Sequence, residues 1–121
     1  MSTNLDNTFS SKTRNMPAGG SIMKAIEAAS GSQSILLGKP NKEVFDMIRK
    51  DHNLEDEPAE KFIMFGDKLD TDIAFGYNCG IDTVLVYSGV TSKSKYEELQ
   101  AKFPDYQPTF KFDSIKDLAP E

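Results

Sequence analysis

The sequence predicts an α/β protein built on a parallel sheet, and three observations support this prediction. Short apolar runs alternate with helical patterns along most of the chain, as in βαβ units. The run 62–65 is apolar at every position, which is typical of strands that are covered on both faces. Polar and charged residues directly follow two of the apolar runs, and parallel sheets hold their ligands in loops at the carboxyl ends of strands.

The first third of the chain predicts two helices and one short extended segment. Residues 1–20 are rich in Ser, Thr, Asn and Gly and predict a loop or frayed terminus. Residues 21–29 carry apolar side chains at helical spacing, and Gly31 ends this helix. A short apolar run over 35–37 then precedes a second helix over about 41–52.

The remainder continues the alternation of strands and helices. After the strand over 62–65, a helix that includes Ile73 and Tyr77 ends at Gly80, which suits a left-handed cap. The later elements are, in order, a strand over 83–87, a helix from near Ser94 to Phe103, a strand over 109–112 and a helical turn over 114–118. Ser94 and Glu97 have the spacing of a capping box.

A candidate metal site follows the strand over 62–65. The strand stops at Gly66, and the carboxylates Asp67, Asp70 and Asp72 follow within six residues. Such hard oxygen ligands suit Mg²⁺, which takes one or two protein carboxylates and fills its other positions with water and substrate phosphate. The alternative is structural: Asp70 or Thr71 caps the next helix, and the other acids are solvated.

A lone lysine stands at a second junction between an extended segment and a helix. Lys39 lies in the sequence Gly38-Lys39-Pro40-Asn41. Its compact positive charge on a long stem could neutralise a phosphoryl group or a carboxylate nucleophile. The alternative is that this sequence is simply a turn.

Composition indicates a small cytoplasmic unit with no nucleic-acid or membrane partner. The chain has 121 residues, a formal charge of -5 and a pI of about 4.9, and it lacks the Lys/Arg cluster of a nucleic-acid surface. No segment approaches membrane-spanning length, and the polar start does not predict a secretory signal. The single cysteine, Cys79, fits a reducing compartment and predicts a packing residue. The single histidine, His52, predicts a solvated group at a helix end.

Four segments, in this order, resemble a known family. Thr3-Asn4-Leu5-Asp6, Gly38-Lys39-Pro40, Gly66-Asp67-Lys68-Leu69-Asp70-Thr71-Asp72-Ile73 and Val86-Tyr87-Ser88-Gly89-Val90 are similar to motifs of the haloacid dehalogenase (HAD) superfamily. The resemblance is to its p-nitrophenylphosphatase and phosphoglycolate phosphatase branch, which carries a large cap domain. It extends from about Thr3 to Leu118.

The resemblance implies part of a doubly wound parallel sheet with a remnant of the cap domain. Residues 1–30 would be the cap remnant and linker, and residues 31–121 the carboxyl-terminal half of the hydrolase core. The family's nucleophile lies in an Asp-x-Asp-Gly motif, which is absent from this sequence. The chain therefore resembles the carboxyl-terminal part of a phosphatase, without its nucleophile.

The resemblance also implies roles for individual residues. Asp67 would be the direct Mg²⁺ ligand, and Asp72 a supporting ligand or an acceptor that orients Lys39 or metal-bound water. Lys39 would hold the nucleophile and the transferring phosphoryl group. Asn4 and Asp6 match a cap motif and are candidate substrate-binding residues.

Two functions remain open at the level of sequence. In the first, the chain is the carboxyl-terminal part of a Mg²⁺-dependent phosphatase for small phosphate monoesters of the p-nitrophenyl phosphate or phosphoglycolate type, inactive alone. Its partners would be a small phosphorylated metabolite and either a complementary amino-terminal half or a second copy, because an apolar strand with an unpaired edge favours association. In the second, the chain is a non-catalytic HAD-like binding or regulatory module.

Overall fold

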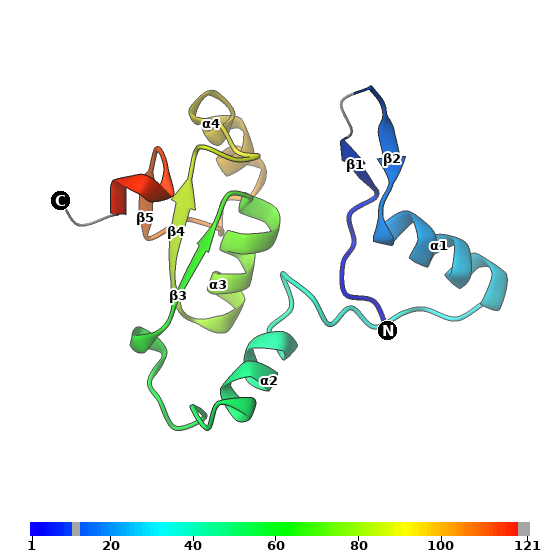
Figure 1. The fold of residues 1–121 in the computed structure, drawn as a ribbon, viewed down its shortest axis with the longest axis horizontal. Helices are drawn as coiled ribbons and strands as arrows, with labels where there is room; N and C mark the ends of the chain where they lie inside the picture. Colours follow the sequence, from blue (N-terminus) through cyan, green and yellow to red (C-terminus); the bar gives the residue numbers. More distant parts are fainter. Residues whose placement is uncertain (11–12, 119–121) are drawn as a thin grey trace.

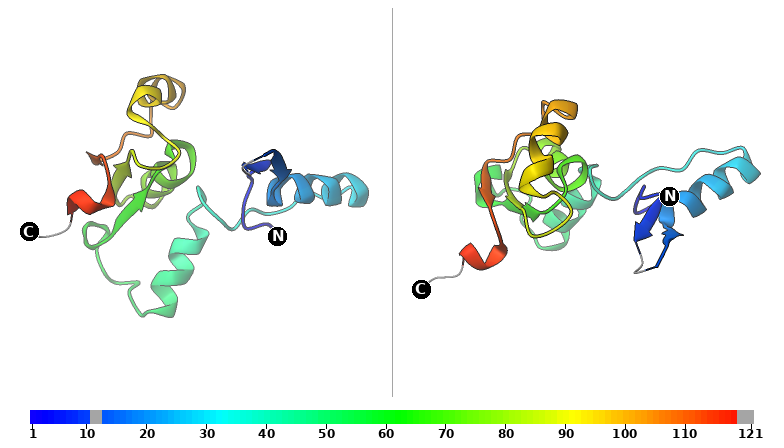
Figure 2. Two further views of the ribbon diagram at one scale, coloured as in Figure 1. Left: turned by 45° about the horizontal axis from the view of Figure 1, so that its top comes forward. Right: turned by 90° about the horizontal axis from the view of Figure 1, so that it is seen from above.

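The chain forms two units joined by the segment between helices α1 and α2 (Figures 1 and 2). The computed structural model describes residues 1–10 and 13–118. The smaller unit contains β1 (Thr8–Ser10), β2 (Asn15–Pro17) and α1 (Gly19–Ser30). The larger unit contains, in chain order, α2 (Glu43–Asp51), β3 (Ile63–Gly66), α3 (Ala74–Cys79), β4 (Asp82–Val86), α4 (Lys93–Lys102) and β5 (Phe110–Phe112).

The larger unit is built on a parallel sheet of three strands. Their order is β3-β4-β5, and both strand pairs are parallel. Helix α3 makes the crossover from β3 to β4, and α4 makes the crossover from β4 to β5. The predicted α/β fold with a parallel sheet is therefore confirmed.

One face of the sheet carries the hydrophobic core. Leu85 of β4 is fully buried against Leu69 and Ile73, which lie in the π-helical turn Leu69–Ile73 that precedes α3. Partly buried aromatic and aliphatic side chains from the end of β4, from α4 and from the loop after it complete the cluster: Tyr87, Tyr96, Leu99, Phe103 and Tyr106. Burying these side chains stabilises the strand-to-helix loop after β3, because that loop contributes part of the core.

The other face of the sheet is uncovered at its two outer strands, whereas Val84 on the central strand is buried. Phe65, Val84 and Phe110 are register partners on the three strands and therefore project to one side. Phe65 is 41% exposed and Phe110 48%, and Ile63 is 44% exposed on the same face. The expectation that the run 62–65 is covered on both faces is therefore wrong for the described residues. The core packs on the face of the sheet that carries Leu85. The outer strands of the second face are therefore left open.

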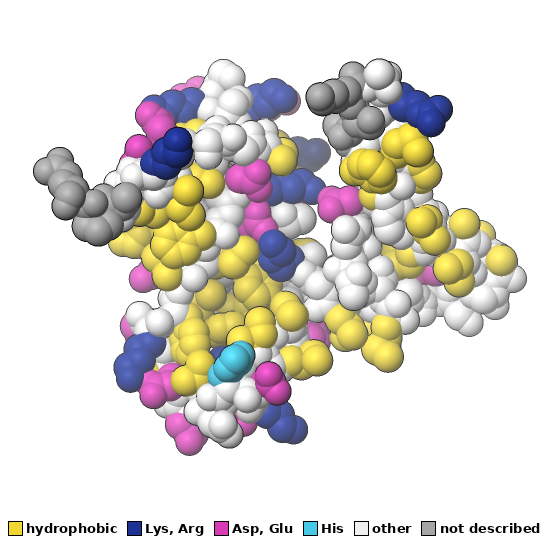
Figure 3. All heavy atoms as spheres, viewed as in Figure 1, with side chains coloured by type: hydrophobic (Ala, Val, Ile, Leu, Met, Phe, Trp, Pro, Cys, Tyr) yellow, Lys and Arg dark blue, Asp and Glu magenta, His cyan; other side chains and the backbone are white. Residues whose placement is uncertain are grey.

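Helix α2 attaches to the larger unit through aromatic contacts. Phe45 is buried and packs edge-on against Phe62, at 5.1 Å between ring centroids, and against Phe75 of α3, at 6.3 Å. The outer face of α2 leaves Met47 and Ile48 exposed. Figure 3 shows hydrophobic side chains gathered on the surface around α2.

The smaller unit differs from the sequence-based expectation. Residues 1–20 contain the antiparallel pair β1–β2, although a loop or frayed terminus is expected there. Each strand has only three residues with one apolar side chain at its centre, which is too short for apolar alternation to identify a strand. Gly31 does cap α1, with φ 67° and its N–H donating to Glu27 O at 2.9 Å.

The extended run 35–37 pairs with the first residues of the chain. Ser2 and Leu36 form an isolated parallel bridge, in which Ser2 N donates to Ile35 O and Leu37 N donates to Ser2 O, both at 2.8 Å. The two ends of the smaller unit therefore lie side by side. The predicted domain boundary after residue 30 stays a prediction.

The helices of the larger unit lie within one or two residues of their predicted bounds. Helix α4 begins at Lys93, but its predicted capping box is not formed: no side chain caps the helix, and the Ser94 hydroxyl pairs with the Ser92 hydroxyl at 3.0 Å. Within residues 1–10 and 13–118, none of the helices combines the length and the apolar character needed to cross a membrane.

Candidate functional site

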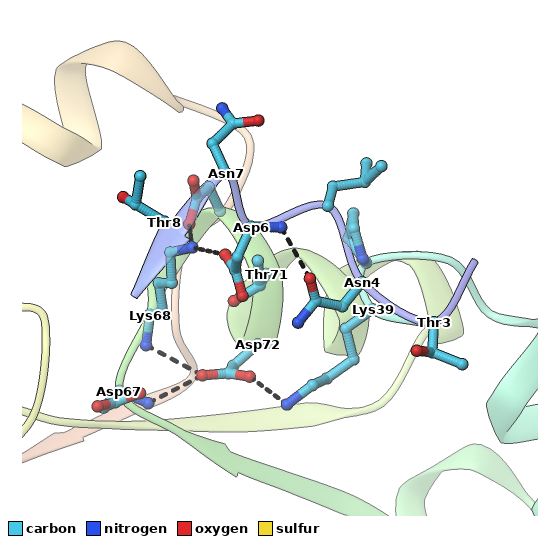
Figure 4. Close-up of a pocket in the computed structure, with 13 residues that line it drawn as sticks. Thr3, Asn4, Asp6, Asn7, Thr8, Lys39, Asp67, Lys68, Thr71 and Asp72 are labelled. Atoms are coloured by element: carbon cyan, nitrogen blue, oxygen red, sulfur yellow. Dashed lines mark hydrogen bonds and ion pairs between the residues drawn. The ribbon is translucent and has the colours of Figure 1, made fainter. Parts of the chain in front are cut away.

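A pocket of about 850 Å³ lies where the two units meet (Figure 4). The smaller unit contributes the stretch Thr3–Thr8 before and at the start of β1. The larger unit contributes Lys39 and Pro40 and most of the loop after β3. All five site residues named from the sequence line this pocket: Asn4, Asp6, Lys39, Asp67 and Asp72.

Asp72 accepts hydrogen bonds from three donors at the floor of the pocket. Its Oδ1 accepts from the Lys39 ammonium at 2.6 Å, and its Oδ2 accepts from the backbone N–H groups of Asp67 and Lys68, both at 3.1 Å. The side chain is 8% exposed, compared with 45% for Lys39. Asp72 therefore fixes both the start of the β3–α3 loop and the direction of the lysine.

Gly66 makes this arrangement sterically possible. A Cβ placed on Gly66 would lie 2.1 Å from Asp72 Cβ and 2.6 Å from its Oδ2. No side chain fits there without moving the carboxylate. The glycine that ends β3 is therefore required by the close approach of Asp72.

Asp67 is held by the loop that follows β4. Its Oδ2 accepts a hydrogen bond from Val90 N, and its carbonyl oxygen accepts one from Thr91 N, both at 2.9 Å. Its own N–H donates to Asp72. The carboxyl ends of β3 and β4 thus jointly position Asp67, as expected for neighbouring parallel strands.

Lys39 reaches the pocket from the connection between the two units. A Cβ on Gly38 would lie 1.9 Å from Thr3 O, so this backbone runs close to the amino-terminal segment. On the other side, the Asn78 side chain donates a hydrogen bond to Pro40 O at 2.8 Å. These contacts bring Lys39 from a position 33 residues away in sequence to Asp72.

Lys68 connects the two units on the opposite side of the pocket. Its ammonium donates to Asp6 Oδ1 at 3.0 Å and lies 3.7 Å from Asp70 Oδ1. Partial burial opposes protonation, but the hydrogen bond that Lys68 donates to Asp6 and the charges of Asp70, Asp6 and Asp72 outweigh it and raise the pKa of Lys68. The ammonium of Lys68 therefore links Asp6 of the smaller unit to Asp70 of the loop after β3.

The charge balance of the lining favours a cation. Four carboxylates and two ammonium groups, 2 − 4 = −2, line the pocket, so the lining is net negative and attracts positive ions. Within the described ranges, no cluster of three carboxylate, histidine or cysteine side chains could enclose a metal. Both Asp72 oxygens already accept hydrogen bonds, so Asp67, with only Oδ2 engaged among the described residues, fits a direct Mg²⁺ ligand better than Asp72 does, and one carboxylate is within the usual number for Mg²⁺.

The structure brings the sequence-based candidates together but assigns them unequal contacts. Lys39, Asp67 and Asp72 form one connected group. Asn4 lies further along the wall and accepts the backbone N–H of Asp6 at 3.0 Å, while Asp6 pairs with Lys68. The roles of all five residues stay predictions.

Sequence reasoning missed the supporting residues of the site. Val90 and Thr91 contact Asp67 through backbone N–H groups, and Gly38 and Gly66 allow close approach of neighbouring groups. None of these residues has a side chain that suggests a chemical role. The available signal was the quoted motif Val86–Val90, which had a place in the resemblance but no role. Only the three-dimensional contact with Asp67 gives it one.

Comparison with known proteins identifies the family. A family model described as HAD-hydrolase-like matches residues 36–118. Rat chronophin is 41% identical over 103 residues, covering 84% of this chain and 32% of chronophin. Human glycerol-3-phosphate phosphatase is 34% identical over 123 residues, covering 98% of this chain and 37% of the relative.

Solved structures agree with the sequence matches. A p-nitrophenyl phosphatase from Archaeoglobus fulgidus superposes with a TM-score of 0.80 at 28% identity, covering 95% of this chain and 43% of that one. A 4-nitrophenylphosphatase from Thermotoga maritima gives 0.76 at 36% identity, with coverage of 94% and 41%. A glycerol phosphate phosphatase from Mycobacterium tuberculosis in complex with magnesium gives 0.75 at 25% identity, with coverage of 98% and 33%.

The chain spans about a third of the length of these curated relatives and less than half of the solved structures. Its parallel sheet and the sequence of its β3–α3 loop are those expected of the superfamily. It belongs to the HAD superfamily of hydrolases, as a partial relative of that superfamily's phosphatases.

Proposed function

We propose that the chain is the carboxyl-terminal part of a Mg²⁺-dependent phosphatase that hydrolyses small phosphate monoesters, of the p-nitrophenyl phosphate, phosphoglycolate or glycerol phosphate type. The observation that carries the proposal is the contact of Lys39 with Asp72 beside Asp67 in one pocket. The 2.6 Å ion pair directs a positive charge into a site that also offers a carboxylate. Phosphoryl transfer depends mainly on such positioning and charge stabilisation.

Lys39 and the loop after β3 have separate tasks in this proposal. The Lys39 ammonium neutralises an incoming phosphoryl group, while Asp72 holds the ammonium in place. Asp67 is the protein ligand for Mg²⁺, which when bound would neutralise charge on the phosphate oxygens. Without a cation, the net negative lining would repel a phosphate dianion.

The covalent step requires a group that this sequence does not contain. No Asp-x-Asp-Gly motif is present, so we expect the chain alone to be inactive. A complementary amino-terminal half would supply this group, whereas a second copy of the chain lacks the same motif and could only cover the open edge of the sheet. Two observations support a partner of substantial size: β3 is an edge strand, and the chain exposes 8555 Å², about 2,000 Å² more than the roughly 6,500 Å² expected for a compact protein of its mass.

The test is a chimera that supplies the missing nucleophile. Residues 1–121 replace the matching segment of human glycerol-3-phosphate phosphatase, to which they are 34% identical. We expect Mg²⁺-dependent hydrolysis of p-nitrophenyl phosphate by the chimera. Lys39→Ala and Asp67→Asn should each lower kcat/KM by roughly 100-fold or more, the scale of losing one preorganised charge at a phosphoryl site.

An exposed carboxylate outside the pocket provides the control. Asp105→Asn changes the charge by the same amount as Asp67→Asn, but Asp105 does not line the pocket, so its chimera should keep full activity. A folded chimera without activity would contradict the phosphatase proposal and favour the non-catalytic module. The isolated chain, assayed beside its Lys39→Ala form, should show no turnover above that variant.

A further inference from the structure

We propose that Gly89 is a positioning residue that lets the loop after β4 close on Asp67 and fix the orientation of its carboxylate. The proposal rests on the proposed function, because the carboxylate is the one assigned to Mg²⁺. It gives a role to the segment Val86–Val90, whose motif belongs to the resemblance without contributing a charged or nucleophilic group to the pocket.

The three atoms nearest to a side chain at Gly89 all belong to Asp67. A Cβ built on Gly89 would lie 1.9 Å from Asp67 Oδ2, 2.4 Å from its Cβ and 2.5 Å from its Cγ. All three distances are far below van der Waals contact. The next two residues, Val90 and Thr91, donate their backbone N–H groups to Asp67 Oδ2 and to its carbonyl oxygen, both at 2.9 Å.

Space, and not backbone conformation, requires glycine at this position. Among the described glycines, only Gly31 and Gly80 have the positive φ that favours glycine. Gly89 has an ordinary φ that any residue could adopt. The requirement for a missing side chain therefore comes from the carboxylate of Asp67.

The contacts also decide which oxygen of Asp67 is available. Oδ2 is occupied by the Val90 N–H and lies directly against Gly89. Oδ1 accepts no hydrogen bond from any residue in the described ranges, and Asp67 lines the pocket. The loop therefore holds one oxygen and leaves the other for a cation, which preorganises the ligand before the ion arrives.

A double-mutant cycle in the 121-residue chain tests the contact without any metal. Gly89→Ala should lower the folding equilibrium constant roughly 10-fold or more, the scale of overpacking a close contact. The Asp67→Gly background removes all three clashing side-chain atoms. There, Gly89→Ala should lower the folding equilibrium constant less than about 3-fold. An equal cost in both backgrounds would overturn the proposal.

Gly76→Ala is the matched control. Its Cβ would lie 2.0 Å from Thr83 Cγ2, so the closest approach is similar but involves one atom and occurs between α3 and β4. Gly76→Ala should lower the folding equilibrium constant by the same factor whether residue 67 is Asp or Gly. A coupling of Gly76→Ala as large as that of Gly89→Ala would mean that the cycle reports general loosening, and it would also count against the proposal.

Two spectroscopic readouts separate positioning from stability. The Val90 amide proton should shift upfield in Asp67→Asn, where its acceptor loses its charge, and should stay unchanged in Asp70→Asn; no shift in Asp67→Asn would overturn the contact even if Gly89→Ala does not fold. Mn²⁺ binding followed by electron paramagnetic resonance should weaken about 10-fold in folded Gly89→Ala. The double-mutant cycle could show coupling between Gly89 and Asp67 while the unaltered chain binds no Mn²⁺. This result would support the positioning role of Gly89 but contradict the metal part of the proposed function.

Discussion

Only 6% of the acidic residue Asp72 is exposed, and each of its carboxylate oxygens accepts at least one hydrogen bond. A buried charge of this kind is tolerated because a cation and backbone N–H groups compensate it. The pair with Lys39 therefore serves the local structure as well as any reaction. The loop after β3 and the direction of Lys39 depend on the same carboxylate.

Asp72→Asn tests this dependence at the level of one residue. The amide has one oxygen acceptor, so its NH₂ group must face either the Lys39 ammonium or the two backbone donors. We expect a loss of about 1.5–3 kcal/mol in the free energy of unfolding, the range for a hydrogen bond to a charged group, measured by urea denaturation. Asp105→Asn, at an exposed position, should stay within about 0.5 kcal/mol of the unaltered chain.

Cys79 is a half-buried free thiol that the site does not use. Burial raises the pKa of the thiol from 9.0 to about 11, and the carboxylate of Asp46 adds to the effect. The folded chain therefore keeps this proton when the unfolded chain has lost it. The stability linked to Cys79 is complete below pH 9 and is lost as the pH rises toward 11.

The measurement for Cys79 is the rate of alkylation by iodoacetamide between pH 7 and 11. At pH 8.5 the folded chain should react roughly 10- to 100-fold more slowly than the chain unfolded in urea, because only the thiolate reacts. If the alkylation rate of the folded chain rose with a midpoint near pH 9, the raised pKa of Cys79 would be contradicted.

At the scale of elements, β3 combines a free edge with an uncovered apolar face. Such a strand favours association, and a charge on its exposed face blocks it. Phe65→Lys should therefore keep the chain folded, since Phe65 is already 41% exposed, while shifting sedimentation toward the monomer. Leu85→Ala, at a fully buried position of the same sheet, should instead cost about 2–5 kcal/mol of stability. Unchanged association in Phe65→Lys would exclude this face as the contact.

The elements that the sequence predicts well are those whose pattern reflects burial. The three strands of the parallel sheet and helices α2 and α4 lie close to their expected bounds. Their apolar runs and helical spacing reflect the positions that face the core, such as Leu85 and Phe45. The hairpin β1–β2 was not predictable in this way, since its two strands have three residues each and are too short to show a pattern of burial.

The candidate site shows the same division. Lys39, Asp67 and Asp72 could be named from charge and spacing, because each follows an apolar run at the end of an extended segment. The pairing of Lys68 with Asp6 spans 62 residues, and no local pattern predicts such a contact. The tight approach of Asp67 to Gly89 likewise depends on how β3 and β4 align, which is a property of the sheet.

At the scale of the whole molecule, two units share one pocket and are linked across it by the ion pair of Lys68 and Asp6. Both side chains are partly exposed, so the pair contributes only about 0.2–1 kcal/mol. Asp6→Asn should therefore leave global stability nearly unchanged but loosen the smaller unit, with a larger radius of gyration in X-ray scattering. Lys93→Met, which removes an ion pair with Asp113 inside the larger unit, should leave the radius unchanged; equal radii for both variants would show that Lys68 does not restrain the units.

The bridge between Ser2 and Leu36 has a consequence for how such proteins can diversify. The first residues of the chain and the segment that leaves the smaller unit lie side by side, so this unit meets the larger one at a single place and can be treated as a cassette. A cassette of another size or sequence could be grafted between those points while Lys39 and the loops after β3 and β4 keep their geometry. The wall of the pocket formed by Thr3–Thr8 could then be exchanged without rebuilding the charged floor beneath it.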